Sequence, residues 1–334
     1  MEQRTLGKTG VDVSVIGLGT WQFGPTWRDL SDTEAMAILA TAADAGVTVF
    51  DTADVYGDGR SEALIGRFLA EHGTDYPAGI TVLTKMGRRA NPHVAAAYNE
   101  ANFRAWLDRS RANLQVDTIP LVQLHCPPTS VYSRPDVFDA LDAIQADGII
   151  AHYGVSVETA GEAMTAIGHP GVASVQIILN VLRRKPLERV LPAAAAAGVG
   201  IIARVPLASG LLTGKFTKDT VFAPTDHRTF NRHGEAFDQG ETFSGVPYEA
   251  GLEAAAQVEA IAHTLPDAPS ASQLALRWVL DQPGVSTVIP GASSTSHVRS
   301  NVVAAGLPRL SGATLDALQA VYDSTVRAAV HHRW

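Results

Sequence analysis

Four side chains with proton-transfer chemistry stand at or just after the ends of apolar stretches in this chain. Asp51 closes one such stretch, and Tyr56 follows five residues later in a loop that contains glycines. Lys85 and His125 close two further stretches in the same way. A carboxylate, a phenol, an ammonium group and an imidazole are groups that enzymes use to hold and transfer protons. We therefore expect these four residues to form a catalytic site.

Each of the four also has an ordinary structural explanation. An aspartate at a strand end often caps the next helix, and a loop tyrosine can pack its ring and expose its hydroxyl. A lysine that closes a strand is usually solvated, and the sequence around His125 could be a structural turn. Catalysis becomes the better explanation only if neighbouring strands deliver all four groups to one place.

The elements that must position these residues alternate regularly along the chain. Ser31-Asp32-Thr33-Glu34 has the pattern of a capping box and predicts a helix that runs to Gly46. Further helices are predicted at 61–72, 99–114, 136–146, 158–167, 186–197, 248–264, 270–281 and 295–304. Strands are predicted at 13–18, 47–51, 80–84, 119–124, 150–155, 172–177, 199–205 and 285–289.

Strand–helix alternation is typical of a parallel sheet, and eight units in a row favour closure into a (β/α)8 or TIM barrel. We expect residues 1–334 to form one such α/β domain. The active sites of these barrels lie at the carboxyl ends of the strands, where Asp51, Lys85 and His125 are predicted to be. A dinucleotide fold of the Rossmann type is not supported, because the segment 17–20 has two of the three required glycines and no helix follows directly.

A long segment, about 208–247, interrupts the alternation after the seventh strand. It is rich in Gly, Thr, Asp, His and Arg, and a connection this long is usually a functional lid or disordered. Its position after a barrel strand would place it over the mouth of the barrel. A surface insertion without a function remains the alternative.

The composition limits the possible partners. Hydrophobic residues make up 46% of the 334 residues and charged ones 18%, which fits a large buried core. A net charge of −8 without a lysine or arginine run argues against nucleic acid and anionic membranes. The apolar stretches are much shorter than about 18 residues, the N-terminus lacks a signal-like segment, and Cys126 has no partner. We expect a cytoplasmic protein, and no cluster has the spacing of a metal site.

Several short motifs, taken together and in order, resemble those of the aldo-keto reductases. They are Gly17–Trp21, Asp51 with Tyr56, Thr84-Lys85, Leu124-His125, Gly154–Ser156, Gln176, Pro206–Lys215, Ile289–Gly291 and Asn301. The resemblance spans essentially the whole chain. It implies a TIM barrel that binds a nicotinamide cofactor without a Rossmann domain and transfers hydride to an aldehyde or ketone.

The resemblance implies a role for each of the four residues. Tyr56 would be the general acid that protonates the carbonyl oxygen, although a free phenol, with a pKa of about 10, is a weak donor at neutral pH. The ammonium group of Lys85 would lower that pKa, and Asp51 would keep Lys85 charged. His125 would orient the substrate oxygen and donate a second hydrogen bond to it.

The cofactor site follows by the same resemblance. We expect contacts from Gly19, Thr20, Trp21, Asp51, Ser156, Gln176, Arg204, Pro206, Leu207, Ser209, Gly210, Leu211, Lys215, Gly291, Ser293, His297 and Asn301. This chain departs from the family pattern at three places. Val157 replaces a common Asn, Arg204 replaces a Tyr that would stack on the nicotinamide, and serines stand where a cation often grips a 2′-phosphate. Arg204 would either stack in place of the Tyr or form a salt bridge. NADPH is the expected cofactor, and NADH is possible.

The substrate is expected to be a small carbonyl compound or alcohol. Trp21, Phe23, Trp27 and Tyr132 could form an aromatic pocket beside Tyr56 and His125, suited to an aldehyde, a ketone or the apolar face of a sugar; simple loop packing is the alternative. Two other functions stay open: a dehydrogenase that oxidises a sugar or alcohol in the reverse direction, and a cofactor-binding regulatory subunit. A monomer is the expectation for the family, and an oligomer is possible.

Overall fold

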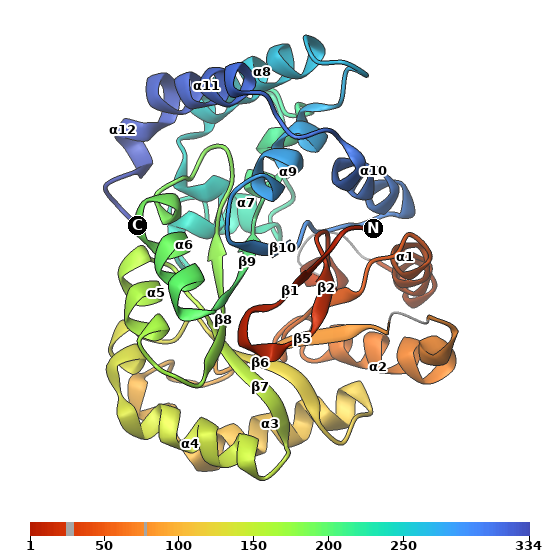
Figure 1. Ribbon diagram of the computed structural model, residues 1–334, viewed down its shortest axis with the longest axis vertical. Helices are drawn as coiled ribbons and strands as arrows, with labels where there is room; N and C mark the ends of the chain where they lie inside the picture. The colour runs from red at the N-terminus through yellow and green to blue at the C-terminus, as the bar shows by residue number, and fades with distance from the viewer. Residues whose placement is uncertain (25–29, 77–78) are drawn as a thin grey trace.

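The computed structural model describes residues 1–24, 30–76 and 79–334, in which eight parallel strands form one curved sheet (Figure 1). The strands follow one another around the sheet in chain order, each bonded to the next. They are β3 (Leu18–Gly19), β4 (Val49–Asp51), β5 (Thr81–Met86), β6 (Ile119–His125), β7 (Ile150–Ser156), β8 (Val172–Ile178), β9 (Gly200–Arg204) and β10 (Val285–Val288).

The sheet closes on itself, as the predicted barrel requires. The segment that contains β3 pairs with β10 through parallel bridges at Ile16–Val288 and Gly19–Gly291, and the Gly17 N–H donates to the Val288 carbonyl at 2.8 Å. Eight buried side chains form a separate apolar cluster; they are Leu6, Val13, Val49, Leu83, Leu121, Ala173, Ile202 and Ile289. We interpret this cluster as the packed interior that (β/α)8 barrels have in place of a pore.

The outer layer consists of the helices that the sequence predicted, α10 among them. Helix α1 begins at Asp32, directly after the Ser31 capping box, because the Ser31 side chain accepts from the Glu34 N–H and the Glu34 carboxylate accepts from the Ser31 N–H. The others are α2 (Arg60–His72), α3 (Glu100–Leu114), α4 (Pro135–Ala146), α5 (Ala160–Ile167), α6 (Pro186–Ala197), α8 (Tyr248–His263), α9 (Ala271–Leu280) and α10 (Thr295–Gly306). In the parts of the chain that the structure covers, no helix has both the length and the apolar character needed to cross a membrane.

Two parts of the fold differ from the prediction. The predicted strand 13–18 is two elements: β2 (Asp12–Ser14) pairs antiparallel with the unpredicted β1 (Gln3–Thr5), and the barrel sheet is joined by β3 and by the isolated bridge at Ile16. Periodicity missed this because Val13 and Leu18 are both buried, although they belong to different sheets. Near the C-terminus, α11 (Gly312–Val321) and α12 (Arg327–Val330) were also not predicted, and α11 packs beside α8 (Figure 1).

The long segment 208–247 lies against the barrel mouth. It contains 3-10 turns at Ala208–Thr213, Gln239–Glu241 and Phe243–Gly245 and the short helix α7 (His227–Phe230). Phe237 packs its ring edge-on against Trp21, which follows β3, with centroids 6.2 Å apart. Glu241 pairs with Arg204 at the end of β9, N to O, at 3.2 Å. Neighbouring elements therefore hold this segment by packing and by ion pairs.

Candidate active site

A buried ion pair joins the ends of the second and third barrel strands. Asp51 ends β4, and Lys85 lies near the end of the adjacent β5. The Lys85 Nζ donates to Asp51 Oδ2 at 2.6 Å and to the Thr52 carbonyl at 2.8 Å, and the two side chains are only 1% and 4% exposed. Burial lowers the pKa of Lys85, but the Asp51 carboxylate raises it, and the net pKa lies above the usual value. Lys85 is therefore a stable ammonium group.

Tyr56 lies beside this ion pair, in the loop between β4 and α2. The Lys85 Nζ lies 3.4 Å from the Tyr56 hydroxyl and 5.0 Å from the ring centroid. Burial raises the pKa of the Tyr56 phenol, and the Lys85 ammonium lowers it without cancelling that effect. The expected lowering by Lys85 is present, but the net pKa is raised because burial, which disfavours the charged phenolate, is the larger effect. The Asp51 carboxylate adds to the increase.

His125 completes the group from the end of β6. Its ring meets the Tyr56 ring edge-on, with centroids 5.9 Å apart. Burial lowers the pKa of His125 well below its ordinary value, and the nearby cations of Arg88 and Lys85 lower it further. The imidazole is therefore neutral. Its Nδ1 is buried and has no hydrogen-bond partner among the described residues. The structure thus brings Asp51, Tyr56, Lys85 and His125 to one rim of the barrel.

Residues from two other parts of the barrel hold Asp51, one through its carboxylate and one through its backbone carbonyl. The Gln176 Nε2, from β8, donates to Asp51 Oδ1 at 2.8 Å and also lies 3.3 Å from Gln123 Oε1. The Thr20 hydroxyl, next to β3, donates to the Asp51 backbone carbonyl at 2.8 Å. Asp51 therefore has a fixed orientation, with one carboxylate oxygen bonded to Lys85 and the other to Gln176.

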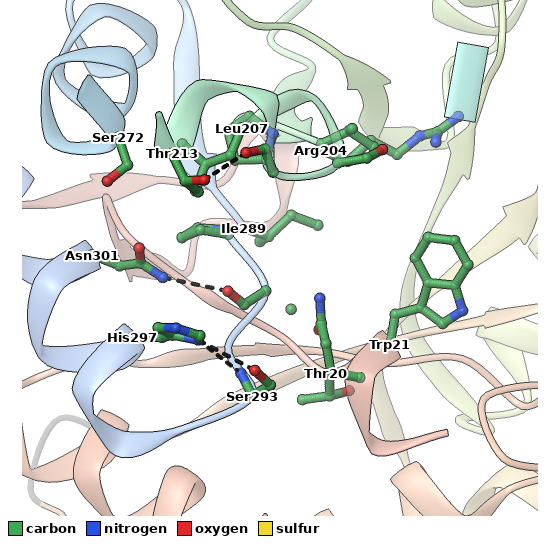
Figure 2. Close-up of a pocket in the computed structure, with 18 of the residues that line it drawn as sticks. Thr20, Trp21, Arg204, Leu207, Thr213, Ser272, Ile289, Ser293, His297 and Asn301 are labelled. Atoms are coloured by element: carbon green, nitrogen blue, oxygen red, sulfur yellow. Dashed lines mark hydrogen bonds between the residues drawn. The ribbon is translucent and has the colours of Figure 1, made fainter. Parts of the chain in front are cut away.

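A cavity of about 560 Å³ begins at these residues and runs toward α10 (Figure 2). Its volume is in the range of small-molecule and cofactor sites. The expected residues that line it are Gly19, Thr20, Trp21, Asp51, Tyr56, Gln176, Arg204, Pro206, Leu207, Ser209, Gly210, Lys215, Gly291, Ser293, His297 and Asn301. In Figure 2, Trp21 and Arg204 lie at one end of the cavity, and Ser293, His297 and Asn301 lie at the other.

The two ends of the cavity differ in chemistry in a way that suits a dinucleotide. Helix α10 begins at one end, where Ser294 caps it, and a helix N-terminus favours phosphate. Lys215 and Gly210 also line the cavity, and Gly210 has a φ of +98°, which favours glycine. Two lining residues have a polar atom that is buried without a hydrogen-bond partner in the described ranges: Gln22, whose Oε1 lies beside Gly291, and Arg204, through its Nε. Such atoms are available to the polar groups of a ligand.

Seven expected residues are not seen on the cavity wall. Two of them are Lys85 and His125, which lie behind it and are 1% and 4% exposed. Ser156 and Leu211 are each 1% exposed, and Phe23 and Tyr132 are fully buried. The Tyr132 hydroxyl donates to the Ser156 carbonyl at 2.8 Å, and the Phe23 ring is part of the main core cluster. Core packing therefore replaces the pocket that was expected from these two rings. Trp27 lies outside the described residues.

Of the two roles expected for Arg204, stacking on the nicotinamide or forming a salt bridge, the structure shows the salt bridge. Its guanidinium group pairs with Glu158 at 2.9 Å and with Glu241 at 3.2 Å, and Arg88 pairs with the same carboxylates at 3.1 and 2.6 Å. We call Arg88, Glu158, Arg204 and Glu241 the ion-pair quartet. The Cys126 sulfur lies within 4.8 Å of carboxylate oxygens of the quartet, a grouping that in isolation could hold a metal ion. The two guanidinium groups already occupy those carboxylates, so the residues do not fit a cation.

Several lining residues were not predicted: Gln22, Val205, Thr213, Phe216, Arg228, Glu241, Ser272, Ile289, Pro290, Ser296 and Ser300. The serines at 293, 296 and 300 repeat at helical spacing, and this pattern could have revealed a polar face at the start of α10. The sequence around Glu241 gave no comparable signal. Glu241 lies in the long segment 208–247, and only the folded path of that segment brings it to the cavity.

Comparison with known proteins agrees with this site. The model of the Aldo/keto reductase family matches residues 15–323. The chain is 29% identical to aldo-keto reductase YhdN of Bacillus subtilis, over 90% of this chain and 87% of that protein. It is 28% identical, over the whole of both chains, to a probable voltage-gated potassium channel subunit beta of Arabidopsis thaliana. The solved glycerol dehydrogenase of Gluconobacter oxydans is 26% identical, with a TM-score of 0.76 over 98% of this chain and 96% of that one. The chain therefore belongs to the aldo/keto reductase family.

Proposed function

We propose that this protein is an NADP(H)-dependent reductase of aldehydes or ketones in which Tyr56 is the general acid. The observation that carries the proposal is the position of the Tyr56 hydroxyl, 3.4 Å from the Lys85 ammonium group at one end of the cavity. An isolated loop tyrosine would not need a buried ammonium group and a neutral imidazole beside it. Their convergence fits a group that gives up a proton during a reaction.

The proposed reaction transfers a hydride to the carbonyl carbon and a proton from Tyr56 to the carbonyl oxygen. When bound, the reduced nicotinamide supplies a hydride, with its electron pair, to the carbonyl carbon and is left oxidised. The π electron pair of the carbonyl group moves onto oxygen, and that oxygen takes the hydroxyl proton of Tyr56. The products are an alcohol and a Tyr56 phenolate, which the Lys85 ammonium group stabilises across 3.4 Å.

The raised pKa of Tyr56 is compatible with this role. A phenol with a raised pKa stays protonated at neutral pH, so the donor is present in every resting enzyme molecule. The oxygen of a reacting carbonyl approaches the basicity of an alkoxide, which is a stronger base than a phenolate. Neutral His125 can donate one hydrogen bond to the same oxygen and stabilise its developing charge.

The cavity suggests which residues would hold the cofactor. Gln176 and Gln22 would bind the carboxamide group, with Trp21 and Thr20 beside the ring. The turn that contains Ser209 and Gly210 would lie along the pyrophosphate. Lys215, Ser293, His297 and the start of α10 would hold the phosphate of the adenosine half, with Asn301 near the adenine. The ammonium group at this end favours NADPH, although the hydroxyl groups also permit NADH.

Two relatives support other functions. The similarity to a glycerol dehydrogenase favours catalysis of alcohol oxidation by the same residues, with the Tyr56 phenolate as the base. The similarity to a potassium channel subunit favours a cofactor-binding regulatory role. The contacts among Asp51, Tyr56, Lys85 and His125 support an enzyme over the regulatory role, because a cofactor-binding subunit has no need of a proton donor.

A two-step experiment tests the proposal. The protein is first titrated with NADPH and with NADH, and binding is followed by the fluorescence of the reduced nicotinamide. Carbonyl compounds, or alcohols with the oxidised cofactor, are then added, and the absorbance of the reduced nicotinamide is followed. Binding followed by turnover is the expected result. Tight binding without turnover of any aldehyde, ketone, sugar or alcohol would support the regulatory role instead.

A further inference from the structure

A chain of three buried hydroxyl groups lies behind the catalytic rim. The Thr52 hydroxyl donates to Ser61 Oγ at 2.8 Å, and Ser61 Oγ lies 2.7 Å from the Thr20 hydroxyl. Thr20 in turn donates to the Asp51 backbone carbonyl at 2.8 Å. All three hydroxyl residues are fully buried. Ser61 therefore joins the residue that directly follows Asp51 to a residue that lines the cavity.

The direction of this chain is fixed by the number of protons. A hydroxyl group has one proton to donate, and Thr20 gives its proton to the Asp51 carbonyl. At the 2.7 Å contact with Thr20, Ser61 must therefore be the donor, and it accepts from Thr52 on its other side. Removing the Ser61 hydroxyl would leave a buried donor at Thr52 and a buried acceptor at Thr20 unpaired, which is unfavourable.

Ser61 also closes the base of the loop that carries Tyr56. This loop runs from Thr52 to Ser61, and the hydrogen bond between these two side chains joins its ends. The Ser61 backbone N–H donates to the Tyr56 carbonyl at 3.2 Å. Ser61 lies in the first turn of α2, whose N-cap is Gly59. The helix therefore gives Ser61 a fixed position, and its hydroxyl serves the loop and Thr20.

The backbone of this loop depends on such a closure. Gly57, Asp58 and Gly59 follow one another with φ values of +60°, +53° and +92°. The two glycines accept many other backbone conformations, and a non-glycine residue such as Asp58 is disfavoured at positive φ. Ion pairs of Asp58 hold the exposed tip of the loop. Ser61 holds the buried base, which is the part that the Tyr56 carbonyl contacts.

We infer that Ser61 is a positioning residue that sets the Tyr56 hydroxyl relative to the cavity wall at Thr20. The inference rests on the proposed function, because it concerns the general acid named there. Thr20 lies on the wall beside which the nicotinamide would bind (Figure 2). The Thr52 carbonyl also accepts from the Lys85 ammonium group at 2.8 Å. Ser61 thus links the proton donor, its ammonium neighbour and the wall beside the hydride donor.

Single-turnover kinetics test this inference. The rate of NADPH oxidation by propanal, or by the carbonyl compound that the wild type reduces fastest, is measured per cofactor-binding site, so that unfolded protein does not count. Ser61→Ala should slow this step about tenfold, because a misplacement of about 1 Å can slow a reaction by about a hundredfold.

Ser110→Ala is the matched control for Ser61→Ala. Ser110 lies on α3 and is 1% exposed, and its hydroxyl has no hydrogen-bond partner within residues 1–24, 30–76 and 79–334. Ser110→Ala therefore removes a buried serine hydroxyl that positions nothing, and it should keep the wild-type rate.

The Tyr56→Phe background separates positioning from a structural role. This background lacks the hydroxyl that Ser61 sets in place, so adding Ser61→Ala there should slow the residual rate less than about twofold, as expected for residues that act together. An equal loss in both backgrounds would overturn the inference, because Ser61 would then act on the fold or on the cofactor alone. An unchanged rate in Ser61→Ala by itself would also overturn it.

Thr52→Val replaces Ser61→Ala if the latter does not fold. Valine keeps the branched shape of threonine and lacks its hydroxyl, so the loop loses the bond at its base. Thr52→Val should slow the same step at least about threefold, and an unchanged rate there counts against the inference. A wild type that binds NADPH but turns over no aldehyde, ketone or alcohol refutes the proposed function itself. An active wild type with an equally active Ser61→Ala refutes only the role of Ser61.

Discussion

The Lys85 ammonium group lies 2.6 Å from a carboxylate oxygen of Asp51, and both side chains are almost completely buried. A buried charge is stable only while its partner is present, because the protein interior solvates an isolated ion poorly. Asp51 is further held by Gln176, and Lys85 by the Thr52 carbonyl. This pair therefore affects the stability of the barrel as well as the proposed chemistry.

Replacing Asp51 with Asn should destabilise the fold strongly. The substitution leaves the Lys85 charge without its counter-ion, and breaking such a buried pair costs about 3–5 kcal/mol. Urea unfolding measures the loss. The double variant Asp51→Asn with Lys85→Met should recover part of it, because no buried charge remains. Arg327→Gln, which removes an exposed pair with Asp323, should change the unfolding free energy by less than about 1 kcal/mol. Equal effects of Asp51→Asn and Arg327→Gln would contradict this account of the pair.

Asp54 should make the stability of the protein depend on pH. Burial raises the pKa of Asp54 to about 7, with a further increase from the Glu62 carboxylate, and neither Asp54 carboxylate oxygen has a hydrogen-bond partner among the described residues. Between about pH 4, the usual pKa of an aspartate, and pH 7, the folded protein holds a proton that the unfolded chain has lost. The stability that this group contributes is complete below that window and is lost as the pH rises through it.

The variant Asp54→Asn should therefore gain stability relative to the wild type as the pH rises across this window, by a few kcal/mol at most. Urea unfolding at the two ends of the window measures the difference. Asp117→Asn, at an exposed position, is the matched control and should show no such trend. A constant difference between Asp54→Asn and the wild type at both pH values would show that Asp54 is already ionised in the folded protein.

The rate of carbonyl reduction should change little with pH through the neutral range. Burial and the cations of Arg88 and Lys85 hold the pKa of His125 well below its usual value, so the imidazole should not titrate near neutrality. Tyr56 has a raised pKa and should lose its proton only above the ordinary phenol value of about 10. Reduction should therefore fall only in strong alkali, whereas alcohol oxidation, which needs the phenolate, should rise with pH. An inflection of kcat/KM for reduction near pH 6.5, the usual histidine value, would show that His125 carries a proton in the free enzyme.

Trp334 should control how firmly the long segment is held. Its indole Nε1 donates to Asp238 at 3.0 Å, the Arg183 guanidinium lies 4.2 Å from its ring, and a Cβ at Gly245 would lie 2.1 Å from the ring. Trp334→Ala removes this packing next to the turn that contains Glu241. Amide hydrogen exchange at 238–245 should become faster, and the KM for substrate should rise more than kcat falls.

The control for this prediction is Trp106→Ala, which removes an indole from α3 at the outer surface of the barrel. It should leave exchange in 238–245 unchanged. Equal exchange at 238–245 in Trp334→Ala and in the wild type would show that the ion pairs of Glu241 hold the segment without help from the indole.

The sequence predicted the parts of the fold that depend on local patterns. Strands β5 to β10 and helix α1 were found because apolar runs and a capping box are properties of short segments. The hairpin of β1 and β2 was missed because three-residue strands have too few positions to show a period. The convergence of Asp51, Tyr56, Lys85 and His125 was predictable because all four lie at or just after strand ends, which a parallel barrel brings to one rim.

The rest of the site depends on contacts between distant segments. Arg88, Glu158, Arg204 and Glu241 come from four separate parts of the chain, and only the fold shows that they pair. The net pKa of Tyr56 likewise depends on how deeply the ring is buried, which no motif reveals.

The most direct test of the central claim is the turnover of Tyr56→Phe, measured together with its affinity for NADPH. The substitution removes one hydroxyl and keeps the ring, and Tyr76→Phe is a control at a tyrosine that bonds to Asp44 instead. We predict that Tyr56→Phe binds the cofactor as tightly as the wild type and reduces carbonyl compounds about a thousandfold more slowly, the scale of general acid catalysis. Carbonyl reduction by Tyr56→Phe at the rate of the wild type would contradict the account.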